Sequence, residues 1–298
     1  MRDIAAVIVT YNRKPLVKRC IESILAQKDA SCDIIVLDNG STDGTERMFA
    51  EEFAGAPIRY SNMHENLGCA ETTARGIEQA VRLGYKYIWI MDDDVFPEPD
   101  ALSALLKMDA KLNGNWGILS GAAYWIDGSL TEANRQKKGL FTFMKDSDYE
   151  RELVKVMFVS LASMFTRADV VREVGLPIGE YFIYTEDYEF CSRVGRKYPI
   201  YVVPSCRVTH AMKVNAKVNF ATESEDRLYR YKYLYRNDVN CYRQFGLKGW
   251  LYLAAKFAYT ALNVLLRARD HKLDKLKVLF NGYREGLSFN PIRKFVTD

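Results

Sequence analysis

Short runs of branched apolar residues alternate with amphipathic stretches over the first part of this 298-residue chain. Uninterrupted runs of this kind are typical of strands that are buried on both faces of a sheet. The predicted strands are residues 4–9, 33–37, 58–61 and 85–91. Because helical patterns of about 10–15 residues separate them, the sequence predicts an α/β fold with a Rossmann-like, parallel-dominated central sheet flanked by helices.

The second half of the chain adds fewer elements. Residues 156–177 predict a strand followed by a short helix, and residues 199–213 predict a pair of strands that reaches His210. A helical pattern follows Glu186 and Asp187, with Tyr188, Cys191 and Val194 on one face. We therefore expect one domain over residues 1–222, with halves at 1–115 and 116–222, and a basic, amphipathic helical region over 223–298.

Composition and charge narrow the functional classes. Hydrophobic residues make up 48% of the chain, enough for a sizeable core, and the six cysteines include no CxxC pair that would indicate zinc or a redox dithiol. The N-terminal apolar run is short and lacks a small-residue cleavage site, so we expect no signal peptide. Residues 1–226 carry 27 basic and 33 acidic side chains, whereas residues 227–298 carry 15 and 5. This asymmetry indicates two tasks on one chain.

Polar side chains follow three of the predicted strands at the point where each strand ends. They are Thr10, Tyr11 and Asn12, then Asp38, then the triplet Asp92, Asp93 and Asp94. In open parallel sheets, ligands bind beyond these carboxyl ends. Each group on its own is also compatible with an ordinary turn. Three on one edge favour a binding site, and three adjacent carboxylates need a cation if they are not simply solvated.

Two further candidates lie in the second half. Glu186 and Asp187 follow an aromatic run and begin a helical pattern, where a carboxylate is also a good helix cap. His210 ends the last predicted strand, and a lone histidine is more often a structural residue than a ligand. These candidates gain weight only in combination with the aspartate triplet.

The ordered set of motifs resembles the inverting glycosyltransferases of family 2, which have the GT-A fold. The resemblance covers roughly residues 3–215 and rests on VIVTYNR, VLDNGSTDGT, NLGCAETTARG, MDDDVFPEPD, YFIYTEDYEFCSRV and VTHAMK in the family's order. The combination is most similar to bacterial galactofuranosyltransferases, and rhamnosyltransferases share much of it. The resemblance implies transfer of a sugar from a nucleotide-diphosphate donor, with residues 1–115 binding the donor and 116–222 the acceptor.

The resemblance also implies roles for the candidate residues. Asp94 would bind Mn²⁺ or Mg²⁺ directly, assisted by Asp92 and His210, while Asp93 would reach the donor's sugar or ribose. Alternation along an extended segment agrees, because Asp92 and Asp94 then face one side and Asp93 the other. Asp187 would be the catalytic base, with Glu186 as the fallback.

Further implied contacts concern the donor and the acceptor. Asp38 would accept the imide N–H of uracil or thymine, which indicates a UDP or dTDP donor, and Arg75 would pair with the diphosphate. Trp125 stacks on an acceptor sugar or packs in the core. The remaining implied donor contacts are Thr10, Tyr11, Asn12, Asn66 and Gly68.

We expect a metal-dependent hexosyltransferase that uses a pyrimidine nucleotide sugar, with UDP-galactofuranose favoured and dTDP-rhamnose the alternative. The acceptor would be a glycan or lipid-linked glycan in surface polysaccharide synthesis. A nucleotidyltransferase is the alternative of another class, but residues 8–18 lack the glycine-rich loop that would hold a triphosphate. A non-enzymatic scaffold would leave the acidic motifs and His210 unexplained.

The basic C-terminal region predicts a membrane contact. Residues 250–266 are 17 residues with one charge, Lys256, which is short for a span and carries an unfavourable central lysine. We favour helices that lie on the inner face of the cell membrane, with basic residues on anionic lipid, in an otherwise cytoplasmic protein. A buried bundle helix is the alternative. No nucleic-acid-binding module is visible, and an oligomer is possible.

Overall fold

The computed structural model describes residues 2–216 and 219–297. A nine-stranded sheet forms the centre, and eight of its strands follow the order β3-β2-β1-β4-β10-β6-β11-β5, with β9 (Val154–Val156) paired to β11. The first four neighbours, β3 (Ile58–Asn62), β2 (Asp33–Asp38), β1 (Ile4–Thr10) and β4 (Tyr87–Asp92), are parallel. The predicted parallel sheet is confirmed.

The rest of the sheet mixes directions. β10 (Met164–Arg167) runs antiparallel to both β4 and β6 (Ile118–Tyr124), whereas β11 (Ile200–His210) is parallel to β6. β5 (Val95–Pro97) pairs antiparallel with the end of β11. Sequence predicted two strands where β11 is one strand, and that prediction is wrong. A register shift between Val203 and Arg207 absorbs the irregularity around Pro204, which has no N–H for the sheet.

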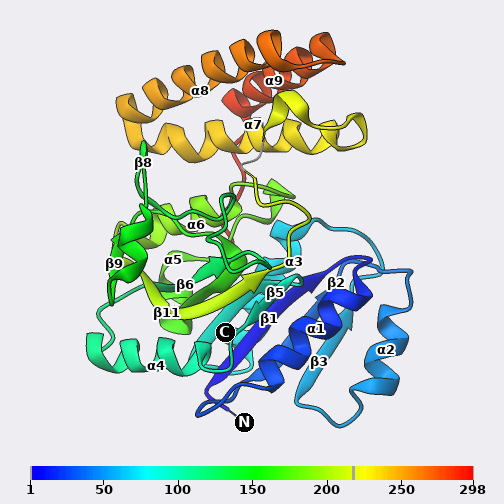
Figure 1. The fold of residues 1–298 in the computed structure, drawn as a ribbon, viewed down its shortest axis with the longest axis vertical. Coiled ribbons are helices and arrows are strands. Elements are labelled where there is room, and N and C mark those ends of the chain that lie inside the picture. Colours follow the sequence, from blue (N-terminus) through cyan, green and yellow to red (C-terminus); the bar gives the residue numbers. More distant parts are fainter. Residues whose placement is uncertain (1, 217–218, 298) are drawn as a thin grey trace.

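Helices cover both faces of the sheet (Figure 1). One apolar cluster joins α1 and α4 to one face, and a second cluster joins α3, α5 and α6 to the other. Alternating residues of β1 separate accordingly, with Val7 in one cluster and Ile8 in the other. The helices are α1 (Lys14–Leu25), α2 (Thr45–Glu52), α3 (Cys69–Arg82), α4 (Ala101–Leu112), α5 (Ala168–Val174) and α6 (Glu186–Val194).

The last three helices form a separate layer at one end of the molecule (Figure 1). α7 (Leu228–Tyr242) packs on α8 (Gly246–Arg267) and α9 (Lys272–Ser288), and a third apolar cluster lies between them. The chain then returns to the first part, where Lys294 O accepts a hydrogen bond from Leu176 N. A short hairpin, β7 (Lys137–Gly139) and β8 (Thr142–Phe143), reaches toward this layer. The predicted helical C-terminal region is confirmed, and its status as a separate domain stays a prediction.

Candidate active site

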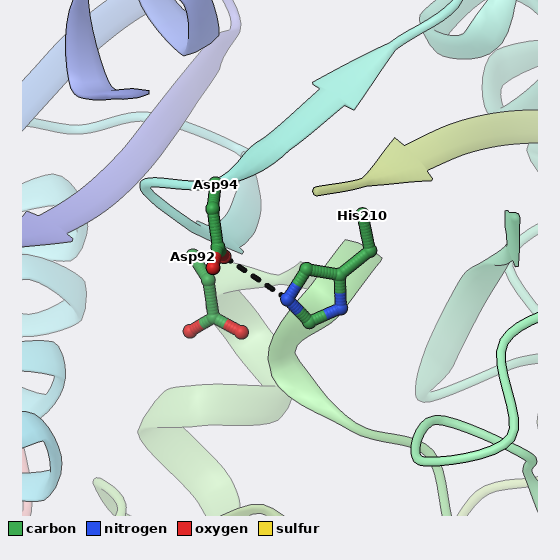
Figure 2. Close-up of side chains that lie close together, drawn as sticks. All are labelled: Asp92, Asp94 and His210. Carbon is green, nitrogen blue, oxygen red and sulfur yellow. Dashed lines mark ion pairs between the residues drawn. The ribbon is translucent and has the colours of Figure 1, made fainter. Parts of the chain in front are cut away.

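Three potential metal ligands meet at one edge of the sheet. Asp92 ends β4, Asp94 lies in the turn to β5, and His210 ends β11, which β5 pairs through Val95. One ligand atom from each of the three lies within 4.8 Å of the others. Figure 2 shows the Asp92 and Asp94 carboxylates and the His210 ring directed toward one space. The antiparallel pairing of two distant segments therefore builds the cluster that the sequence motifs suggested.

The orientation of His210 is fixed from both sides. Its Nε2 lies 3.0 Å from Asp94 Oδ1, and its Nδ1 lies 2.8 Å from Asn134 Oδ1. A side-chain oxygen behind the imidazole is the arrangement that commonly orients a histidine ligand. Asn134 was not among the residues singled out in the sequence, because it lies in an irregular segment far from any motif.

Asp93 lies with Asp94 in the turn between β4 and β5, so the segment is not extended here and the predicted alternation does not apply to it. Asp93 Oδ2 accepts a hydrogen bond of 2.8 Å from Thr10 Oγ1, and its Oδ1 accepts one of 2.9 Å from Arg13. The same Arg13 Nη1 lies 2.8 Å from Asp94 Oδ2. Sequence analysis missed Arg13, although it follows the Thr10–Asn12 motif directly and so belongs to the same sheet edge.

The charged groups of this cluster shift one another's pKa values. Burial raises the pKa of Asp93 to about 6, against the lowering effect of Arg13. Burial also acts to raise the pKa of Asp94, but His210 and Arg13 together hold it below its usual value. Asp94 and Asp92 in turn raise the pKa of His210 in spite of its burial. Burial and the Asp94 charge raise the pKa of Asp92. The edge thus stabilises added positive charge.

Glu186 and Asp187 form a second acidic group at the start of α6. Glu186 is 6% exposed, and its Oε2 has no hydrogen-bond partner within the described residues. Asp187 keeps part of its surface open, and its Oδ1 accepts a hydrogen bond from Tyr188 N. Burial and then the neighbouring Asp187 charge raise the pKa of Glu186. Burial and, more weakly, the Asp92 charge raise the pKa of Asp187.

The predicted nucleotide contacts lie at the ends of β1 and β2. Asp38 is buried, and it accepts hydrogen bonds from Ser41 N at 2.7 Å and Tyr60 Oη at 2.6 Å. Asn12 has a left-handed backbone, with φ at 52°, and its side chain accepts a hydrogen bond from Thr42 N. Both residues organise the loop after β2, while Tyr11 remains 44% exposed at the same edge.

The loop before α3 holds the next predicted contacts. Asn66 Oδ1 accepts a hydrogen bond from Gly68 N, and Gly68 has φ at +83°. A Cβ on Gly68 would lie 2.4 Å from the Phe182 ring, so glycine is required where this loop meets the segment before α6. Arg75 forms an ion pair of 2.9 Å with Glu71 one helical turn away. A role for Arg75 on the diphosphate stays a prediction.

Trp125 contacts the segment next to the metal-ligand cluster. The sequence left open whether it stacks on an acceptor sugar or packs in the core. Its Nε1 donates a hydrogen bond of 2.8 Å to Met212 O, in the segment directly after His210. The ring therefore braces the end of β11. Stacking of this ring on an acceptor sugar stays a prediction.

Comparison with known proteins agrees with this geometry. Residues 5–175, more than half of the chain, match the profile of Glycosyl transferase family 2. The chain belongs to this family. The matched region includes the aspartate triplet and stops before Glu186, Asp187 and His210, so these three residues rest on the structure and on the motif resemblance.

Several curated members of the family share sequence with the chain at low identity. The galactofuranosyltransferase GlfT1 of Mycolicibacterium smegmatis is 25% identical over 200 residues, covering 65% of each protein. The N-acetylglucosaminyl-diphospho-decaprenol L-rhamnosyltransferase of Mycobacterium tuberculosis is 25% identical over 237 residues, covering 70% of this chain and 76% of that protein. Chondroitin synthase of Escherichia coli is 38% identical over 103 residues, 33% of this chain and only 14% of that enzyme. The match thus spans less than two thirds of GlfT1 and a small part of the synthase.

Solved structures establish the fold. GalNAc-T7, crystallised with UDP, GalNAc and Mn²⁺, superposes with a TM-score of 0.61 over 96% of this chain and 56% of that one, at 12% identity. Staphylococcus aureus TarS residues 1–349 give a TM-score of 0.55 over 95% of this chain and 89% of that one, at 13% identity. The expected GT-A architecture is confirmed.

Among the described residues, no helix is both long and apolar enough to cross a bilayer. Lys256, the charge inside the apolar segment, is turned inward on α8 and lies 2.5 Å from Asp238 Oδ2 on α7. It therefore belongs to the contact between these two helices.

Proposed function

We propose that the protein is an inverting, metal-dependent glycosyltransferase that uses a pyrimidine nucleotide-diphosphate sugar. The observation that carries the proposal is the convergence of Asp92, Asp94 and His210 on one point, at the sheet edge where ligands of open α/β folds bind. Family membership supports the reaction class, and the acidic pair of buried Glu186 and partly accessible Asp187 would supply the second group that the reaction needs.

The donor atoms of the cluster fit a divalent cation. Two carboxylates and one imidazole suit Mn²⁺. They would also accept Mg²⁺ if water and phosphate oxygens complete its coordination. Asp94 and His210 would hold the ion, with Asp92 as the third ligand. When bound, such an ion stabilises negative charge on the diphosphate leaving group. Asp93 and Arg13 hold the turn that carries these ligands, through the contacts of Asp93 to Thr10 and Arg13.

Asp187 is the proposed base. An inverting transfer needs a group that takes the proton from the acceptor hydroxyl as it attacks the anomeric carbon. Burial raises the pKa of Asp187 toward the working range of a base at neutral pH, and part of the side chain stays accessible. Glu186 is more deeply buried, which suits a supporting role and leaves it as the fallback base.

UDP-galactofuranose is the favoured donor and dTDP-rhamnose the alternative. A galactofuranosyltransferase and a rhamnosyltransferase each match about two thirds of the chain. Asp38 would select the pyrimidine and Thr10, Tyr11, Asn12, Asn66, Gly68, Arg75 and Asp93 would contact the donor. The deciding experiment is donor hydrolysis across a panel of UDP, dTDP and GDP sugars with Mn²⁺. Release of nucleoside diphosphate from a pyrimidine nucleotide sugar supports the proposal. Pyrophosphate release from a triphosphate plus a sugar phosphate would instead indicate a nucleotidyltransferase.

We also propose that α8 rests on an anionic membrane surface beside a lipid-linked glycan acceptor. Because Lys256 is turned toward α7, the outer face of α8 carries no exposed charge between Lys248 and Arg267. The large apolar side chains exposed on this face are Leu247, Trp250, Leu251, Tyr259, Leu262, Leu265 and Leu266. A helix of this kind inserts its apolar face at the headgroup boundary, aided by basic residues.

Vesicle co-sedimentation tests the membrane contact in the full-length protein. Leu262→Glu combined with Leu266→Glu should abolish binding to vesicles that contain phosphatidylglycerol, while donor hydrolysis in solution is retained. Leu273→Glu, an equally exposed apolar position on α9, is the matched control. Binding that is unchanged by the α8 substitutions, or indifferent to lipid charge and salt, would leave α8 as a packing or oligomerisation surface.

A further inference from the structure

The segment directly before the acidic pair has an unusual backbone. Phe182, Tyr184 and Thr185 all have positive φ, at 65°, 69° and 70°. Side chains other than glycine rarely adopt this region, and the cost must be met by contacts around the segment. Because Thr185 immediately precedes α6, whatever holds this segment also sets where Glu186 and Asp187 lie.

An asparagine of the C-terminal layer holds this segment. Asn237 on α7 is fully buried, and its Nδ2 lies 3.0 Å from Tyr181 O, 3.0 Å from Ile183 O and 2.9 Å from Tyr184 O, so that its two N–H groups are shared among three carbonyls. Only a donor group suits three converging carbonyls, so an amide fits where a carboxylate would not. The arrangement joins Asn237 to three carbonyls of this segment that lie 53 to 56 residues earlier in the sequence.

Both neighbours of Asn237 reinforce the contact. Arg236 orients the amide by donating to Asn237 Oδ1 from Nε at 3.1 Å and from Nη2 at 3.0 Å. The same Nη2 donates to Glu180 O at 2.6 Å. On the other side, Asp238 Oδ1 accepts a hydrogen bond of 3.1 Å from Thr185 Oγ1, and Asp238 Oδ2 pairs with Lys256 of α8. Three consecutive residues of α7 thus bind the segment that leads into the acidic pair, Arg236 and Asn237 through its carbonyls and Asp238 through the Thr185 hydroxyl.

We propose that Arg236, Asn237 and Asp238 are positioning residues for the catalytic base, with Asn237 at their centre. The C-terminal layer then has a second task besides any membrane contact, since it holds the segment 182–185, three of whose residues have positive φ, and with it the Asp187 carboxylate. This inference rests on the proposed function, because it takes Asp187 as the base. A misplacement of about 1 Å in a catalytic group can cost on the order of 10²-fold in rate.

Asn237→Asp tests the proposal in the full-length protein. It preserves side-chain size but removes the donor and places a charge against three carbonyls. We expect kcat to fall by on the order of 10²-fold, with the donor KM within about threefold of wild type. Faster hydrogen exchange should be confined to amides of residues 180–187. A structural defect alone would instead speed exchange throughout α7–α9.

The matched control is Asn240→Asp on the same helix. Asn240 is also buried, but its side chain contacts Phe289 O and the Tyr181 hydroxyl and none of the three loop carbonyls. Its kcat should stay within a few-fold of wild type. Equal kcat for Asn237→Asp and Asn240→Asp would overturn the proposal.

Thr185→Val provides a second test that leaves α7 intact and decides the matter if Asn237→Asp does not fold. It removes the hydroxyl bonded to Asp238 and should lower kcat several-fold, again with faster exchange at 180–187. Unchanged kcat and exchange would count against the proposal. An active Asp187→Asn would refute the proposed base instead, and exchange at 180–187 would still test whether Asn237 holds the segment.

Discussion

The candidate active site has two acidic groups, Asp92–Asp94 and Glu186–Asp187, whose side chains are of one chemical type but have different neighbours. Around Asp92–Asp94 the protein supplies its own cations, since Arg13 contacts Asp93 and Asp94, and His210 contacts Asp94. Around Glu186 and Asp187 no ion pair is formed within the described residues, and one Glu186 oxygen lacks any partner. The first group is arranged to hold positive charge, and the second is arranged to hold a proton.

This difference in neighbours supports the roles proposed for the two acidic groups. Cationic partners keep Asp94 ionised, as a metal ligand must be, and its pKa is lowered despite burial. Burial raises the pKa of both Glu186 and Asp187, against a smaller lowering effect of Lys137 on Asp187, as a base that works near neutrality requires. Environments that push the pKa values of neighbouring carboxylates apart commonly separate their roles in enzymes.

Removing the divalent cation should have the largest effect on activity. A metal ion contributes several kcal/mol to stabilising the leaving group, so transfer should fall on the order of 10³-fold or more with a chelator. Asp94→Ala should do the same and should abolish Mn²⁺ binding measured by calorimetry. Asp100→Ala, an exposed carboxylate nearby, is the control and should remain active. Full turnover by metal-stripped enzyme would show that Asp92–Asp94 does not act by holding a metal ion, and the contrast between the two acidic groups would fail.

Asp187→Asn should have the next largest effect. The amide keeps the size of the side chain but takes no proton, so kcat should fall roughly 10²–10⁴-fold with donor affinity little changed. In the wild type, activity should rise with pH along a limb well above the ordinary aspartate pKa of about 4. The measurement is the kcat profile from pH 5 to 9.

Glu186→Gln is the matched control for the base assignment. It should lower kcat less than Asp187→Asn does, because Asp187 still ionises. The reverse order would exchange the two roles, and full activity in both variants would leave the acidic pair as a helix cap.

Much of the fold could be predicted from the sequence, because short apolar runs of neighbouring residues mark most of its strands. Three of the four parallel strands, β1, β2 and β4, are marked by apolar runs, and the end of each of these three places a polar motif at one edge. The sequence placed the aspartate triplet at this edge, but alternation does not explain the directions of its side chains, because Asp93 and Asp94 lie in a turn and both contact Arg13. Two strands were predicted in place of β11 because Pro204 usually ends a strand, whereas here a register shift absorbs it.

The features that sequence could not show are those made by distant contacts. Asn134 stands 76 residues before His210, and Asn237 stands 53 residues after Tyr184. Neither residue sits in a periodic pattern or a polar strand end, so no local rule selects it. Lys256 counted against a membrane span in the sequence, but the sequence did not show that its side chain is directed toward Asp238. Side-chain direction on a helix depends on tertiary packing, which sequence spacing constrains only weakly.

Arg13→Met tests whether Arg13 supplies positive charge to Asp93 and Asp94. Arg13 is about half exposed (48%), so solvent screens its ion pairs and their loss should cost about 1 kcal/mol. That corresponds to roughly 2–4 °C in the unfolding midpoint. Mn²⁺ should raise the midpoint more in the variant than in wild type, because the ion replaces the missing positive charge. Arg47→Met, which breaks an exposed pair with Glu51, is the control, and an equal response to Mn²⁺ in all proteins would contradict the argument.

Glu186→Gln should give the smallest effect, and in the opposite direction, since it should stabilise the metal-free protein. The raised pKa of Glu186 means that the folded state binds its proton more tightly than the unfolded chain does. Wild-type stability is therefore lost as pH rises from the unfolded pKa of about 4.3 toward the folded value. Gln does not titrate, so the variant's advantage in unfolding midpoint should be absent near pH 4 and grow to about 2–4 °C above neutrality, for about 1 kcal/mol. A variant less stable at every pH would mean that the charged Glu186 has a compensating partner, and the contrast between the two acidic groups would then disappear.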